Sequence, residues 1–153
     1  MTKKERFFKI KDELDKLYKN PHCTLNYNSP FELLIATMLA AQCTDARVNI
    51  VTKTLFKVAN SPEQFSKMDI KEIENLISSI SFFRNKAKHI KECSIQIIKQ
   101  FDGNVPNTIE ELTMLSGIGR KSANVIMLEA FNKCEGIAVD THALRLSNRL
   151  RII

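Results

Sequence analysis

Two residues have the types and the placement for nucleophilic chemistry, Lys121 and Asp140. Lys121 follows the turn-forming stretch LSGIG (115–119) and lies in the first turn of a predicted helix. Positive partial charges at a helix N-terminus favour the neutral amine, which is the nucleophilic form. Asp140 follows an apolar run, 137–139, and begins another predicted helix. Together they suggest a nucleophile with a carboxylate partner. The alternatives are a lysine that only contacts phosphate and an aspartate that only caps a helix.

The segment before Lys121 predicts an anion-binding hairpin. A short helix, the turn LSGIG and a second helix, RKSANVIMLEAF, occupy residues 108–131. Gly117 and Gly119 permit positive φ and allow close approach of another molecule. Arg120 and Lys121 lie where the helix macrodipole is already positive, which is unfavourable unless an anion binds there. A helix-hairpin-helix that grips a nucleic-acid backbone fits this pattern, and a plain helix corner is the alternative.

The remaining chain predicts an all-α domain of eight to ten mostly short helices. A charged amphipathic helix is expected over 4–18 and a loop over 20–30. Ser29 to Glu32 have the pattern of a capping box that opens a buried helix, and Ser61 to Gln64 and Asp69 to Glu72 repeat it. Thr44 or Asp45 is predicted to cap a third helix, and a longer helix is expected from about 85 to 101.

Composition is typical of a globular protein with a polyanionic partner. The 153 residues are 44% hydrophobic and carry a formal net charge of +6. No apolar run is long enough for a membrane span, and the charged N-terminus has no signal-peptide core, so we expect an intracellular protein. The four cysteines (Cys23, Cys43, Cys93 and Cys134) are far apart and show no C-x-x-C pair. They are predicted to be structural and buried, with no metal site.

Three stretches together resemble the endonuclease III family of DNA glycosylases and AP lyases. They are LNYNSPFELLIATMLAAQCTD (25–45), LSGIGRKSANVIM (115–127) and IAVDTHALRLSNRL (137–150). The resemblance implies the helix-hairpin-helix DNA glycosylase fold and base excision repair of oxidised pyrimidines. It implies that Lys121 attacks C1′ of the damaged nucleoside and forms a Schiff base, that β-elimination then cleaves the strand, and that Asp140 assists. The implied partner is double-stranded DNA with damaged pyrimidines or abasic sites, bound by a monomer in the bacterial cytoplasm, associated with the nucleoid.

The resemblance also assigns DNA contacts. Gln42 matches a polar residue that fills the hole left by the flipped nucleotide, and Phe82 falls where the family has a leucine wedge after a glycine. Here Ser81 replaces that glycine, and core packing is the alternative for Phe82 and Phe83. His142 is expected to position Asp140, to contact DNA or to be structural. The backbone phosphate is assigned to Gly117, Ile118, Gly119 and Arg120.

Family members continue into further helices with four cysteines that hold a [4Fe-4S] cluster, and those cysteines are absent here. We therefore expect a chain truncated before the cluster region, with no cofactor of its own, although the family's hairpin can hold a monovalent cation. The expected domains are an N-terminal helix (1–22) that normally packs on the cluster domain, a six-helix-type domain (23–136) and the start of the second domain (137–153).

Two other functions stay open from the sequence. The chain could be a non-catalytic helix-hairpin-helix module, because Lys121 and Asp140 can persist in an inactive protein. An oxidised-guanine glycosylase and lyase shares the lysine but matches the stretch 29–45 less well. The adenine-mismatch glycosylases lack a lysine at position 121, which argues against that class.

Overall fold

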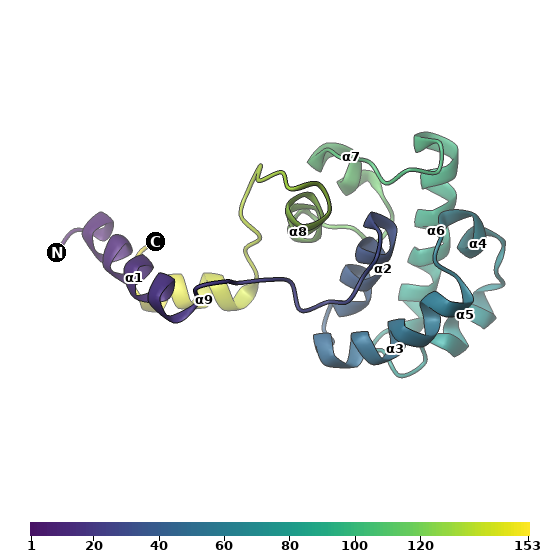
Figure 1. Cartoon of the computed structure of the whole chain (residues 1–153), viewed down its shortest axis with the longest axis horizontal. Helices are drawn as coiled ribbons and strands as arrows, with labels where there is room; N and C mark the ends of the chain where they lie inside the picture. The colour runs from purple at the N-terminus through teal and green to yellow at the C-terminus, as the bar shows by residue number, and fades with distance from the viewer. The chain divides into compact units, whose positions relative to one another are not determined.

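The computed structural model describes all residues from 1 to 153, and every regular element in it is an α-helix (Figure 1). This confirms the all-α prediction. The nine helices are α1 (Lys3–Leu17), α2 (Pro30–Ala40), α3 (Asp45–Val58), α4 (Pro62–Lys67), α5 (Ile70–Leu76), α6 (Phe83–Phe101), α7 (Ile109–Met114), α8 (Arg120–Phe131) and α9 (Thr141–Arg149).

The chain forms two compact units. One is continuous and comprises residues 24–138, with helices α2 to α8. The other combines the two ends of the chain, residues 1–23 and 139–153, and contains α1 and α9. Lys121 belongs to the first unit and Asp140 to the second.

The core of the larger unit is built around α2. Leu33, Leu34, Ile35, Ala36 and Leu39 of this helix have no exposed surface. Helices α3, α6 and α8 all pack against α2, and α4 and α5 pack against α6. A helix that is apolar nearly all round has to be surrounded by other helices, as the sequence predicted. Each fully buried leucine or isoleucine contributes about 1.5–3 kcal/mol relative to an exposed one.

The start of α2 differs in detail from the predicted capping box. The Ser29 hydroxyl accepts from the Glu32 N–H at 3.1 Å, as expected. The Glu32 carboxylate, however, accepts from the Asn28 N–H at 2.7 Å rather than from that of Ser29. The reciprocal bond has moved one residue upstream because the chain enters the helix with the Asn28 amide facing the carboxylate.

Two other predicted helix starts are also corrected. At α4, the Ser61 hydroxyl caps the helix, but Gln64 Oε1 accepts from the N–H of Asn60 at 2.9 Å. At α5, the Asp69 side chain makes no capping hydrogen bond. Helix α3 begins after Thr44, whose hydroxyl accepts from the Arg47 N–H. The long helix α6 begins at Phe83, two residues earlier than predicted.

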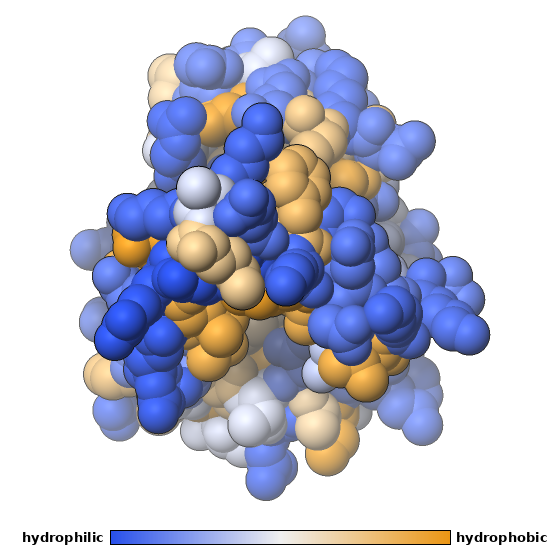
Figure 2. Space-filling view, turned by 90° about the vertical axis from the view of Figure 1, so that its left-hand side faces the viewer, coloured by the Kyte–Doolittle hydropathy of each residue, from blue (hydrophilic) through white to orange (hydrophobic).

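The smaller unit exposes much apolar surface. Neither α1 nor α9 contains a buried residue. The two ends of the chain meet where Arg6 Nη1 donates to the carbonyl of Arg151 at 3.0 Å. Exposed large side chains of the unit include Phe7, Phe8, Leu17 and Leu144. Apolar groups are visible among hydrophilic ones on the face drawn in Figure 2.

The cysteine prediction is wrong in part. Cys93 is fully buried in α6, and this burial raises the pKa of its thiol to about 12. Cys134 is exposed and lies beyond the end of α8, where no core covers it, and Cys23 and Cys43 are half-buried. None of the helices has the length and apolar character needed to cross a membrane.

Candidate nucleic-acid interface

The predicted hairpin is present, with α7 and α8 joined by the turn 115–119. Gly117 has φ +80°, in the left-handed region, and a Cβ there would lie 2.9 Å from the Cβ of His89. Gly119 has φ −93°, and a Cβ there would meet nothing within 4 Å. The expectation of positive φ therefore holds for Gly117 and is wrong for Gly119. Gly119 leaves its outer face open to another molecule.

Side chains from one face of α6 hold the turn in place. The Ser116 N–H donates to Gln96 Oε1 at 2.7 Å, and Gln96 Nε2 donates to the carbonyl of Met114 at 3.3 Å. The Ser116 hydroxyl donates to the Glu92 carboxylate at 2.8 Å and lies 2.8 Å from Nδ1 of His89. His89, Glu92 and Gln96 are spaced to share one helix face, which is the only signal of this role in the sequence.

The first turn of α8 is open to an anion. Gly119 caps the helix without a side-chain hydrogen bond, and the first turn has no acidic residue. Arg120 and Lys121 are the first two helical residues, and both are exposed. The first N–H groups of a helix have no partner within the helix, so they and the macrodipole attract anions.

Ile118 contributes through the shape of the turn. Its side chain is buried, and its N–H donates to the carbonyl of Leu115 at 3.2 Å. The backbone donor that the sequence assigned to phosphate is thus used within the turn. Gly117 and Gly119 are exposed beside it.

Asp140 lies at the N-terminus of α9. Its Oδ1 accepts from the Ala143 N–H at 2.7 Å, so Asp140 caps α9, and this bond fixes the orientation of the carboxylate. His142 is exposed, and its Nδ1 lies 3.3 Å from Nη2 of Arg145. Lys121 and Asp140 belong to different units of the chain.

Gln42 and Phe82 are brought together by a hydrogen bond that the sequence did not predict. The Ser81 hydroxyl donates to the carbonyl of Gln42 at 2.7 Å. Gln42 has φ +53° and Phe82 has φ +57°, and both side chains are exposed. Phe82 is 62% exposed, so core packing is wrong for this residue. Phe83 is half-buried, with the guanidinium of Arg84 4.7 Å from its ring centroid.

Lys86 supports the same region through hydrogen bonds to the end of α2. It is 6% exposed, and its Nζ donates to the carbonyls of Leu39 at 2.9 Å and Ala41 at 2.5 Å. Burial lowers the pKa of this lysine, and the nearby Cys43 acts in the opposite direction. Lys86 thus satisfies the carbonyls at the end of α2. It makes these bonds only in the folded chain, where α6 packs against α2.

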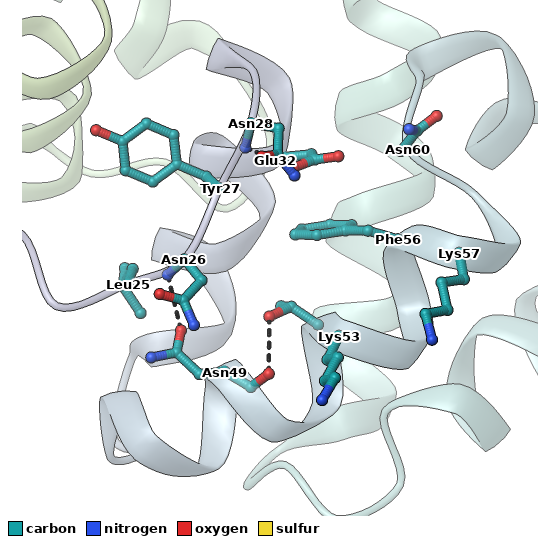
Figure 3. A pocket seen from close by; sticks show the side chains of 11 residues that line it. Leu25, Asn26, Tyr27, Asn28, Glu32, Asn49, Lys53, Phe56, Lys57 and Asn60 are labelled. Atoms are coloured by element: carbon teal, nitrogen blue, oxygen red, sulfur yellow. Dashed lines mark hydrogen bonds between the residues drawn. The ribbon is translucent and has the colours of Figure 1, made fainter.

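A pocket of the larger unit lies elsewhere. It has a volume of about 730 Å³ and is lined by residues of the segment 25–32 and of α3. Figure 3 shows the rings of Tyr27 and Phe56 at its wall with Lys53 and Lys57 on α3. None of the predicted site residues lines this pocket, so it is not the candidate site.

The cysteines present do not fit an iron–sulfur cluster. Cys93 is enclosed in the core, whereas Cys134 is exposed. No group of three or more His, Cys, Asp or Glu side chains is arranged to hold a metal ion.

Comparisons with known proteins agree with the fold and the hairpin. Residues 35–153 match the family model described as HhH-GPD superfamily base excision DNA repair protein. The chain is 48% identical to endonuclease III of Synechocystis sp. over 149 residues, which are 97% of this chain and 68% of the relative. It is 45% identical to endonuclease III of Bacillus subtilis over 141 residues, 92% of this chain and 64% of the relative.

Solved structures also match the fold of this chain. A trapped endonuclease III–DNA covalent intermediate matches with a TM-score of 0.91 and 44% identity over 96% of this chain and 68% of that one. A thermostable thymine-DNA glycosylase, at 22% identity and a TM-score of 0.82, shares the fold. The chain spans roughly two thirds of the length of the proteins it matches. It belongs to the HhH-GPD superfamily of base excision DNA repair proteins and, within it, to the endonuclease III family.

Proposed function

We propose that this chain binds double-stranded DNA and acts as a DNA glycosylase and AP lyase on oxidised pyrimidines, with Lys121 as the nucleophile. The observation that carries the proposal is the open first turn of α8, where two exposed cations lie beside uncapped backbone N–H groups. A backbone phosphate at this turn offsets the repulsion between the cations and the macrodipole. The solved DNA complexes of endonuclease III support the same partner for this chain.

The chemistry proposed here begins with the amine of Lys121, and the phosphate bound at the hairpin positions the DNA strand. Lys121 Nζ forms a bond to C1′ while the bond from C1′ to the base breaks, and the base leaves with the electron pair and gains a proton. Ring opening gives an imine, and loss of a proton from C2′ expels the 3′-phosphate. The Asp140 carboxylate stabilises the positive charge that develops on the sugar. The base has to leave the stack first, which costs less for a damaged base.

The hairpin carbonyls and His142 have supporting roles in this proposal. Backbone carbonyls of the hairpin turn are proposed to hold a monovalent cation beside the bound phosphate, as the resemblance to endonuclease III implies. His142 is exposed at the start of α9, one turn or less from Asp140, where it would contact DNA. The bound protein is a monomer, and in the cell it works on the bacterial nucleoid.

Borohydride trapping on a duplex with one abasic site tests the nucleophile. The unsubstituted chain should give a covalent adduct, and Lys121→Arg should give none. Lys121→Arg keeps the cation for phosphate, so its affinity for DNA should stay within about fivefold, since a surface ion pair contributes at most about 1 kcal/mol. Lys133→Arg is the matched control, because Lys133 is an exposed lysine just beyond the other end of α8. An adduct of normal yield from Lys121→Arg would assign the nucleophile to another amine.

Base release from a duplex with one oxidised pyrimidine separates the two roles of Asp140. Asparagine caps helices about as well as aspartate, so Asp140→Asn keeps the bond to Ala143 and removes only the charge. We expect normal helicity by circular dichroism, and base release slowed by about a hundredfold or more. Normal base release from Asp140→Asn would leave this residue with the capping role alone.

A further inference from the structure

Hydrogen bonds connect the loop that carries Gln42 to the chain around Phe82, at the start of α6. Gln42 follows the last turn of α2, and Phe82 is the N-cap of α6. The Ser81 hydroxyl bonds to the Gln42 carbonyl, and Lys86 bonds to the carbonyl of Ala41, immediately before Gln42. Two adjacent carbonyls of one loop therefore accept from two side chains at the start of α6.

Both exposed residues are held in an unfavourable backbone conformation. A left-handed φ costs a residue with a side chain about 1–2 kcal/mol, and an aromatic residue adopts it rarely. Such strain persists only where surrounding contacts enforce it, and it is concentrated at functional sites. Here the contacts that enforce it on the Gln42 side are the bonds from Ser81 and Lys86.

The pair lies close to the hairpin within the same unit. The Gly117 Cβ position is 2.9 Å from His89 Cβ and 3.2 Å from Met38 Sδ. Met38 is in the last turn of α2, and His89 is in the second turn of α6. Gln42 and Phe82 lie just past the ends of these same two helices, about one to two turns from the hairpin contact.

We propose that Ser81 is a positioning residue that locks the Gln42 loop to the Phe82 loop, so that the amide and the aromatic ring enter a DNA lesion as one preformed unit. The inference rests on the proposed function. An aromatic ring can wedge between bases, and an amide can bond to the edge of an unpaired base. Fixing both in advance lowers the entropy lost on binding.

The bond matters most when DNA is bound. In the free chain Ser81 is half-exposed, so water competes for the Gln42 carbonyl. A DNA duplex closing over both loops excludes that water and leaves the carbonyl dependent on Ser81. A glycine at position 81 would have no hydroxyl to make this bond. The serine thus compensates for a bulkier wedge by adding a hydrogen bond to the neighbouring loop.

Equilibrium binding to a duplex with one tetrahydrofuran abasic analogue, and to the same duplex without it, tests the proposal. Ser81→Ala should weaken binding to the analogue duplex by about three- to tenfold, the range for loss of one hydrogen bond, and change binding to the plain duplex by less than about twofold. Ser81→Thr retains the hydroxyl and should restore affinity. Ser79→Ala is the matched control, because Ser79 is exposed two residues away and makes no hydrogen bond.

A fluorescence readout reports the wedge itself. The chain has no tryptophan, so Phe82→Trp introduces a single tryptophan at the wedge position, which can be excited apart from the two tyrosines. Its emission should be quenched when the ring stacks in the analogue duplex. Ser81→Ala in this background should reduce the quenching at saturating DNA, and Ser81→Thr and Ser79→Ala should leave it unchanged.

A double substitution shows whether Ser81 acts through Gln42. Gln42→Ala should weaken binding to the analogue duplex, and adding Ser81→Ala should weaken it little further, because coupled residues are not additive. The inference fails if Ser81→Ala and Ser79→Ala behave alike, or if Ser81→Ala weakens both duplexes equally. If the unsubstituted chain shows no preference for the analogue duplex, the proposed function fails together with the inference.

Discussion

At the scale of single residues, the two glycines of the hairpin turn have different roles. Gly117 has a positive φ and is packed against His89 and Met38. Gly119 has an extended conformation that any residue adopts, and its outer face is open. The first glycine is required by the fold, whereas the second is explained only by the approach of another molecule.

Substitution by alanine should therefore affect mainly stability at Gly117 and mainly DNA binding at Gly119. Gly117→Ala should lower the free energy of unfolding by about 2 kcal/mol, from the left-handed backbone and the contact with His89. For a chain of this size that lowers Tm by about 4–8 °C. Gly119→Ala should cost less than about 1 kcal/mol, the usual loss for a poorer N-cap, yet weaken DNA binding. Thermal melts and binding isotherms on both variants check this, and equal stability losses would contradict it.

At the scale of helices, the local signals were predictable and the connections between helices were not. Ser29, Ser61, Thr44, Thr108 and Asp140 each cap the helix that follows, and such caps depend on a few neighbouring residues. The hairpin was predictable for the same reason.

Contacts between distant residues account for what sequence reasoning missed. The bond from Ser81 to Gln42 joins residues 39 positions apart, and the bond from Ser116 to Gln96 joins residues 20 apart. Nothing local in the chain distinguishes Ser81 from the exposed Ser79. The role of Lys86 was hidden in the same way, since a lysine in an amphipathic helix is expected to be solvated.

The buried face of α6 has a consequence for stability at high pH. Burial raises the pKa of Cys93 from 9.0 to about 12, so the folded chain keeps this proton while the unfolded chain releases it above pH 9. Between pH 9 and 12 the folded chain therefore binds more protons than the unfolded chain. The stability contributed by Cys93 is lost as pH rises through this range, by about 1.4 kcal/mol per pH unit. Lys86 has the opposite sign, because its lowered pKa makes stability rise with pH below 10.5.

Comparison with Cys93→Ala isolates the cysteine, since Lys86 is common to both proteins. The variant should be less stable at pH 7, because a buried side chain is shortened. Urea unfolding at pH 7 to 10 should show this difference shrinking above pH 9. Cys134→Ala, at an exposed position, is the control and should differ from the unsubstituted chain by a constant amount. A constant difference for Cys93→Ala as well would contradict the burial argument.

At the scale of the whole molecule, stability is divided unequally between the two units. The fully buried large side chains all lie in residues 24–138, from α2 to α8. Helices α1 and α9 bury no residue, and each is at or below the length at which an isolated helix is stable in water. Helix propensity, the capping box of Thr2 and Glu5 and the Asp140 cap are the contributions that remain.

Amide hydrogen exchange followed by mass spectrometry should resolve this division. Amides of α1 and α9 should exchange at least about a hundredfold faster than those of α2 and of the buried face of α6, since local opening spans from near zero to the global free energy. Adding a duplex with an abasic analogue should slow exchange at the hairpin and at the loops of Gln42 and Phe82. Protection of α9 on the same addition would place Asp140 in the complex and support its catalytic role. Uniform exchange in α1, α2 and α9 of the free chain would instead mean that the two units unfold together, and that the exposed faces of α1 and α9 are stabilised by contacts made in solution.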